Sequence, residues 1–124
     1  MENEISEKVI GAAMEVHRTL GPGLLESAYA AALAIELQER GCAFEREKAI
    51  HASYKGQQLG AVFRADFVVE NCLVLELKAV DTLAEQHASQ LLTYLRLTDL
   101  RLGLLINFNQ ATLVKGLRRV INSP

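Results

Sequence analysis

The feature that most constrains the fold is the segment RADFVVENCLVLELKAV, residues 64–80. Two runs of β-branched and apolar residues flank a Glu-Asn turn signal, a pattern typical of two antiparallel strands. Asp66, Glu76 and Lys78 nevertheless interrupt these runs. Charges in so apolar a segment need an explanation, because a buried charge is costly unless it is paired or bound.

Side chains alternate between the two faces of a strand, and this alternation fixes how the two runs can pair. The second run has one wholly apolar face, made of Leu73, Leu75, Leu77 and Ala79. The first run is expected to match it with Phe63, Ala65, Phe67 and Val69. A three-residue loop, 70–72, aligns these faces and places Asp66 opposite Glu76 and Arg64 opposite Lys78. A two-residue turn would set phenylalanines beside the charges, because a one-residue slip exchanges every side chain between faces.

In the predicted register two carboxylates lie about 5 Å apart between their Cβ atoms and repel each other. A divalent cation, a shared proton or a lysine would relieve that repulsion. Mg²⁺ prefers oxygen ligands, which Asp66, Glu76 and the backbone carbonyl of Leu77 can supply. Lys78 would then hold or deprotonate an attacking water and offset negative charge in the transition state. This pattern indicates metal-assisted phosphodiester hydrolysis; a solvated sheet face or an ordinary cross-strand ion pair is the structural alternative.

The rest of the chain predicts an α/β fold of α+β order, with a central mixed β-sheet flanked by helices. Apolar residues recur at helical spacing in three segments: Asn3–Leu20, Leu24–Arg40 and Thr82–Leu97. The GPG sequence at 21–23 ends the first helix, and the second is expected to turn Leu25, Tyr29 and Leu37 inward. Strands are expected at Phe44–Tyr54, Gln58–Val69, Leu73–Val80 and in LRLGLLINF, and the final QATLVKGLRRVI favours either a strand or a short helix. The strands on either side of the third helix should be parallel.

Composition limits the classes of function. A chain of 124 residues is expected to form one domain, and it contains no run of the roughly 20 apolar residues needed for a membrane span. Its acidic N-terminus does not resemble a signal peptide, so a cytoplasmic location is expected. The net charge of −2 gives no global attraction to nucleic acid, and a basic patch such as KGLRR, 115–119, would have to supply it. So small a surface would grip a duplex poorly alone, which favours a homodimer.

The motifs resemble those of a known enzyme superfamily. Asp66 followed after a turn by Glu76-Leu77-Lys78 resembles the core of the PD-(D/E)XK nucleases, the restriction-endonuclease-like fold. More narrowly, the chain resembles the small bacterial GxxExxY proteins over nearly all of its length. The blocks that carry this resemblance are EVHRTLGPGLLESAY, ADFVVENCLVLELKAV, QLLTYL and GLLINF.

The resemblance implies a nuclease that acts on DNA or RNA with Mg²⁺ or Mn²⁺. It implies that Asp66, Glu76 and Lys78 are catalytic, and that Glu26 joins the two carboxylates and the Leu77 carbonyl at the metal. It also implies that three side chains position the substrate or the site: Tyr29, Gln90 and Tyr94. Taken alone, Glu26 is also explained by the preference for acidic residues in the first turn of a helix. A non-catalytic, nuclease-like binding or regulatory subunit of a larger assembly is the alternative function.

Overall fold

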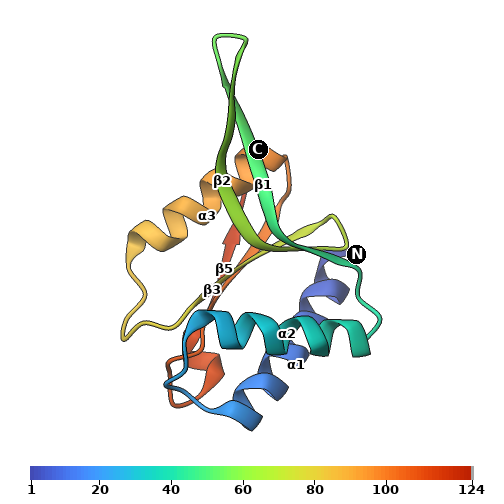
Figure 1. Ribbon diagram of the computed structural model, residues 1–124, viewed down its shortest axis with the longest axis vertical. Coiled ribbons are helices and arrows are strands. Elements are labelled where there is room, and N and C mark those ends of the chain that lie inside the picture. Colours follow the sequence, from blue (N-terminus) through green and yellow to red (C-terminus); the bar gives the residue numbers. More distant parts are fainter. Residues whose placement is uncertain (124) are drawn as a thin grey trace.

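The structure is a computed structural model that describes residues 1–123. Two helices come first, three strands follow, and a third helix leads to the last two strands (Figure 1). The elements are α1 (Glu2–Leu20), α2 (Glu26–Glu39), β1 (Phe44–Tyr54), β2 (Gln57–Val69), β3 (Leu73–Lys78), α3 (Glu85–Thr98), β4 (Leu102–Asn107), the 3₁₀ helix η1 (Leu113–Gly116) and β5 (Leu117–Ile121). Among these residues no helix is both long and apolar enough to span a membrane.

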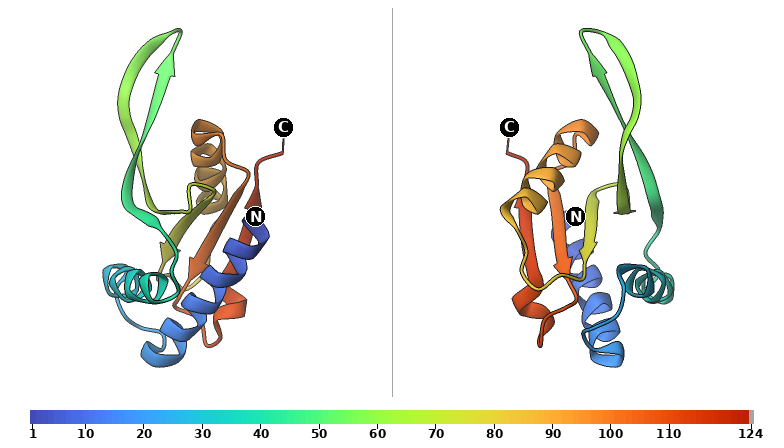
Figure 2. Two further views of the ribbon diagram at one scale, coloured as in Figure 1. Left: turned by 90° about the vertical axis from the view of Figure 1, so that its right-hand side faces the viewer. Right: turned by 60° about the vertical axis from the view of Figure 1, so that its left-hand side comes forward.

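The five strands form one mixed sheet in the order β1-β2-β3-β4-β5. Only β3 and β4 pair in parallel, across the connection through α3, and the other neighbours are antiparallel. Helices α1 and α2 pack on one face of the sheet and α3 packs on the other, and each face has its own apolar cluster (Figure 2). The predicted mixed sheet flanked by helices is therefore confirmed, including the parallel pair around the third helix.

The helix boundaries differ from prediction where the chain is extended before a helix. Helix α2 begins at Glu26, because Leu25 has φ −76° and ψ 155° and stands outside the helix as its N-cap. The prediction that Leu25 points inward is wrong, since its side chain is 78% exposed. Helix α3 begins at Glu85 for the same reason: Ala84 is extended, and its N–H donates to Nδ1 of His87.

The C-terminal segment contains both of the elements that its sequence favoured. The 3₁₀ helix η1 turns the chain back, and β5 then pairs antiparallel with β4 from Leu102↔Ile121 to Ile106↔Leu117. Gly116 makes this turn possible, because a Cβ at that position would clash with the backbone carbonyl of Asn107.

The register between β2 and β3 is the predicted one. Val69 pairs with Leu73 and Phe67 with Leu75, so residues 70–72 form the predicted three-residue loop. Glu70 and Asn71 both have positive φ, near 50°, which closes the turn tightly. Over residues 67–69 and 73–75 the side chains therefore lie on the predicted faces of the two strands.

Beyond Phe67↔Leu75 the two strands separate, and here two predictions are wrong. No β2–β3 ladder continues to set Arg64 opposite Lys78. Phe63 and Ala65 join the cluster beneath α3, whereas Phe67 lies in the cluster beneath α1 and α2. This change of faces occurs between Ala65 and Phe67, opposite Glu47 of β1, whose φ is +52°.

Candidate active site

The site begins where β2 leaves β3. Strand β3 remains paired with β4 as far as Lys78, but its other edge loses the β2 ladder after Leu75. The Asp66 carboxylate takes over this edge: its Oδ2 accepts a 2.8 Å hydrogen bond from the backbone N–H of Leu77. In an extended strand the N–H and C=O of one residue point to the same side, so the Leu77 carbonyl faces this open edge too.

Glu76 is a buried acid with a strongly raised pKa. Its side chain is only 6% exposed, and Oε1 has no hydrogen-bond partner among the described residues. Burial raises the pKa of Glu76 to about 9, aided by a hydrogen bond to Asp66 and by the negative charge of that residue, while Lys78 acts in the opposite direction. The predicted pair of carboxylates therefore does come together, and without a cation it holds a proton at neutral pH.

Helix α3 covers this pair with Tyr94. The ring is 5% exposed and packs against Phe63, with 5.1 Å between ring centroids. Burial raises the pKa of Tyr94 to about 12, and the negative charges of Glu76 and Asp66 contribute further. Tyr94 therefore presents a neutral hydroxyl near the two acids. Gln90 lies one turn earlier on α3 and is exposed to solvent.

A cavity of about 240 Å³ opens beside Asp66. Its lining comes from α2, β1, β2 and β3 and consists of Glu26, Ser27, Ala30, Arg46, Glu47, Asp66 and Leu77. The first residue of α2, Glu26, thus reaches the same cavity as Asp66. Within residues 1–123, however, no three side chains of His, Cys, Asp or Glu converge closely enough to hold a metal ion by themselves.

Two cavity residues, Arg46 and Glu47, have no place in the sequence prediction. Glu47 stands across from Asp66, between the ladder pairs Arg46↔Phe67 and Lys48↔Ala65, in a left-handed conformation that non-glycine residues rarely adopt. Such strain is often found at functional sites. The Arg46 guanidinium lies over the Phe67 ring, 5.5 Å from its centroid, and is the only cation of this lining. Neither feature could be predicted from the sequence, because residues 44–54 show only the loose alternation of a strand.

Tyr29 has a different setting from the one the motif implied. Its side chain is fully buried and stacks on Phe108, with 4.4 Å between ring centroids. Its hydroxyl donates to the carbonyl of Gly21 at 2.6 Å and accepts from the N–H of Leu24 at 3.1 Å. These contacts occupy the hydroxyl and hold the loop that leads to Glu26.

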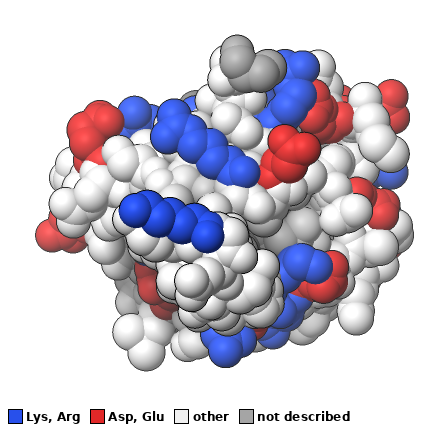
Figure 3. All heavy atoms as spheres, turned by 90° about the horizontal axis from the view of Figure 1, so that it is seen from above, with Lys and Arg blue, Asp and Glu red and all other residues white. Residues whose placement is uncertain are grey.

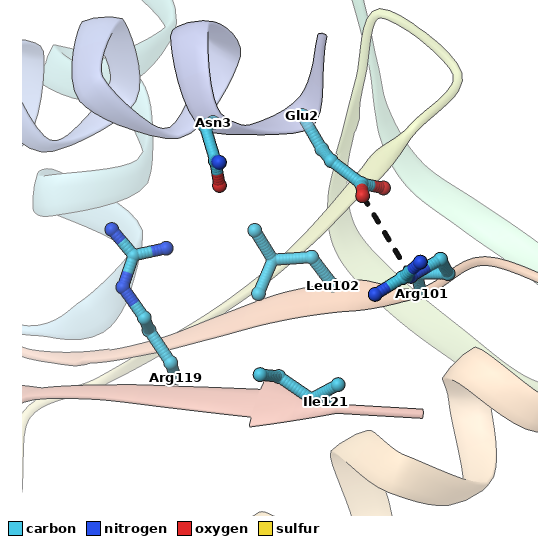
Figure 4. Close-up of a pocket in the computed structure, with 6 residues that line it drawn as sticks. All are labelled: Glu2, Asn3, Arg101, Leu102, Arg119 and Ile121. Atoms are coloured by element: carbon cyan, nitrogen blue, oxygen red, sulfur yellow. Dashed lines mark ion pairs between the residues drawn. The ribbon is translucent and has the colours of Figure 1, made fainter. Parts of the chain in front are cut away.

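A second cavity, of about 220 Å³, lies at the other end of the sheet between the start of α1 and strands β4 and β5 (Figure 4). Arg119 of β5 and Arg101, the residue just before β4, line it, and Nε of Arg101 pairs with Glu2 at 3.7 Å. The KGLRR segment is also neutralised in part, because Arg118 forms a two-point contact with Glu85. This cavity contains neither motif carboxylate, and we assign no chemistry to it.

The comparisons with known proteins agree with this geometry. Residues 3–120 match the family model described as the PD-(D/E)XK nuclease superfamily. The chain therefore belongs to that superfamily, and its sheet has the corresponding core. No curated protein and no solved structure matches the chain in these comparisons.

Proposed function

We propose that the protein is a metal-dependent phosphodiesterase that cleaves nucleic acid with an activated water molecule. The observation that carries this proposal is the buried Glu76 carboxyl, which lies against Asp66 and leaves Oε1 unpartnered. Two acids held together in an apolar setting destabilise a fold unless a bound ligand compensates, and such pairs are common at functional sites. Membership of a nuclease superfamily supplies the class of reaction.

The residues present fit a hard divalent cation, Mg²⁺ or Mn²⁺. Asp66, Glu76 and the carbonyl of Leu77 offer oxygen ligands along one strand edge, and Mg²⁺ commonly takes only one or two protein carboxylates. Glu26 adds a carboxylate to the same cavity. A bound cation would supply Lewis acidity toward the phosphate and lower the pKa of a water molecule.

The chain's own side chains complete the proposed mechanism. Lys78 would orient or deprotonate the attacking water, and its charge would stabilise the negative charge that grows on the phosphate. Tyr94, kept neutral, would donate a hydrogen bond close to the acids. Gln90, exposed on the same face of α3, would contact the substrate, and Arg46 would hold a phosphate in the cavity.

The experiment is a cleavage screen with single-stranded, duplex and branched DNA and RNA, each in Mg²⁺ and in Mn²⁺. The wild type should cut at least one substrate, and Lys78→Ala should reduce the rate by about 10²- to 10⁴-fold. Glu7→Gln, a change at an exposed glutamate of α1, is the matched control for Glu76→Gln. Cleavage that survives both Lys78→Ala and Glu76→Gln would show that another protein or another site is responsible.

A second candidate function has its own observation. Two exposed apolar side chains, Leu20 (39%) of α1 and Ile35 (60%) of α2, line one groove between these helices. Contiguous apolar surface often marks a protein contact. A non-catalytic subunit of a larger assembly would bind the cation and nucleic acid but cut none of the substrates in the screen. The GxxExxY assignment stays a prediction from the sequence blocks.

A further inference from the structure

The β1–β2 hairpin extends well beyond the rest of the sheet. After β2 leaves β3, the two strands continue as a ribbon, residues 48–64, which we call the hairpin arm (Figures 1 and 2). Its base packs against α3 through Ile50 and Phe63, and the rest of it extends beyond the sheet. About nine residues of β2 separate its tip from Asp66, a reach of roughly 30 Å at about 3.3 Å per residue. A two-stranded ribbon is at best marginally stable alone in water, so an arm of this length favours a binding partner.

The charge of the hairpin arm is opposite to that of the rest of the molecule. It holds three of the thirteen Lys and Arg residues and none of the fifteen Asp and Glu residues, so the remainder of the chain has a net charge of −5. Lys48 pairs with Glu45 at 2.9 Å, but within residues 1–123 neither Lys55 nor Arg64 forms an ion pair. Seen from above, basic side chains lie in the middle of the surface, and acidic side chains lie beside some of them (Figure 3).

The shape of the hairpin arm also points to a particular partner. Register shifts between Ile50 and His51 and between Ala52 and Ser53 place two bulges in the ribbon, and bulges increase its twist. Lys55 and Gly56 form the tight turn at the tip, with φ of 50° and 77°. A twisted two-stranded ribbon fits the major groove of B-form DNA, which is about 12 Å wide, whereas the major groove of A-form RNA is too narrow to admit it.

The hairpin arm is joined directly to the candidate active site. Arg64 precedes Asp66 by two residues, and its Nη1 donates to the carbonyl of Glu47, another cavity residue, at 3.4 Å. A duplex lying along the arm would therefore pass the cavity. The arm's length of roughly 30 Å is close to one turn of B-form DNA, about 34 Å, so both ends of the arm can meet phosphates of one turn.

We propose that the hairpin arm holds double-stranded DNA by lying along its major groove, with Lys55 and Arg64 on the phosphates. This inference rests on the proposed nuclease function and narrows its substrate to duplex DNA. The exposed side chains of Tyr54 (62%) and Leu59 (58%) supply apolar contact to the bases or sugars of that groove.

The test is binding of a labelled 20-base-pair DNA duplex by fluorescence anisotropy at several salt concentrations. The Glu76→Gln background is used so that substrate is not cut. One lost phosphate contact reduces the slope of log K against log salt by about 0.9, which is about an eightfold loss at 0.1 M salt. Lys55→Gln should show this change, and Lys55→Gln with Arg64→Gln should show about twice the change in slope. Lys8→Gln, an exposed lysine of α1, is the matched control and should bind as the parent does.

Hydrolysis of bis(p-nitrophenyl) phosphate with Mn²⁺ separates the two proposals, because so small a diester does not reach the arm. Lys55→Gln should hydrolyse it at the wild-type rate, while Lys78→Ala should not. If Lys78-dependent cleavage is present but Lys55→Gln binds duplex DNA like the parent, the arm proposal fails and the nuclease proposal stands. The arm proposal also fails if Lys55→Gln and Lys8→Gln lose the same amount of affinity for duplex DNA. It fails as well if the protein prefers single strands or duplex RNA to duplex DNA. A third contrary result is sedimentation in which Lys55→Gln changes only the self-association of the protein. Absence of cleavage and of binding in the wild type overturns both.

Discussion

The raised pKa of Glu76 predicts how the free energy of unfolding depends on pH. In the folded protein the pKa of Glu76 is raised from 4.5 to about 9, chiefly by burial. Between these values the folded state keeps a proton that the unfolded state releases. Stability is therefore greatest near and below pH 4.5 as far as this group is concerned, and it falls as pH rises toward 9.

The magnitude follows from linkage. One extra proton in the folded state corresponds to a loss of about 1.4 kcal/mol per pH unit, so about 3 kcal/mol between pH 6 and pH 8. For a chain of this size that is a fall of roughly 10 °C in melting temperature. Glu76→Gln keeps the shape and the hydrogen-bonding capacity toward Asp66 but cannot ionise. The variant should therefore lack this slope and be more stable than the wild type at pH 8.

The assay is urea unfolding followed by circular dichroism in metal-free buffer at pH 6, 7 and 8. Glu7→Gln, exposed on α1, removes a carboxylate while leaving the Glu76 pair intact, and it should retain the wild-type slope. The reasoning is refuted if the wild type shows no loss of stability over this range. It is equally refuted if Glu76→Gln and wild type fall in parallel.

Three further predictions test the cation, the turn and the loop. At pH 8, Mg²⁺ at about 100 times its dissociation constant should stabilise the wild type by about 2.7 kcal/mol, and calorimetry in buffers of different ionisation enthalpy should detect the release of a proton. Asp66→Asn should show neither effect. A purely structural ion-pair network predicts no stabilisation by Mg²⁺ in either protein. Gly116→Ala should lower the unfolding free energy by about 2 kcal/mol or more, seen as a lower urea midpoint, because its Cβ clashes with the carbonyl of Asn107; an unchanged midpoint would contradict the turn geometry. Tyr29→Phe should cost about 1–3 kcal/mol in the same assay, because the carbonyl of Gly21 loses a part-buried hydrogen bond of 2.6 Å; an unchanged midpoint would contradict a role of this bond in holding the loop.

The pairing of β2 with β3 could be predicted because its signal is local and redundant. Apolar residues at alternate positions fix which faces meet, and the loop of residues 70–72 fixes the register. The same holds for the helices, whose apolar period and GPG stop signal are properties of short segments. These features follow from alternation and turn chemistry, which act over a few residues.

The separation of β2 from β3 could not be predicted in this way. Alternation assumes a regular strand, and nothing in the residues around Asp66 signals that its side chain will replace a backbone partner of Leu77. The left-handed backbone of Glu47 is equally hidden, because glutamate has no preference for that conformation. Both are tertiary effects: they depend on how the hairpin arm twists toward α3 while the base of the strand stays beneath α1 and α2.

These hidden features explain why the motif acids lie where they do. A glutamine or an apolar residue at position 76 would stabilise the core more than glutamate does, because a buried acid that must keep a proton weakens the fold at neutral pH. Elsewhere in the sheet local preference and tertiary structure agree, as in β4, which is apolar and buried over all of Leu102–Ile106. A mismatch between the residue type and its tertiary environment is expected where function determines the residue. Here the open strand edge at Leu77 and the strained backbone of Glu47 share one cavity with Asp66, the partner of the buried Glu76, and this combination is a stronger argument for catalysis than the spacing of the motif alone.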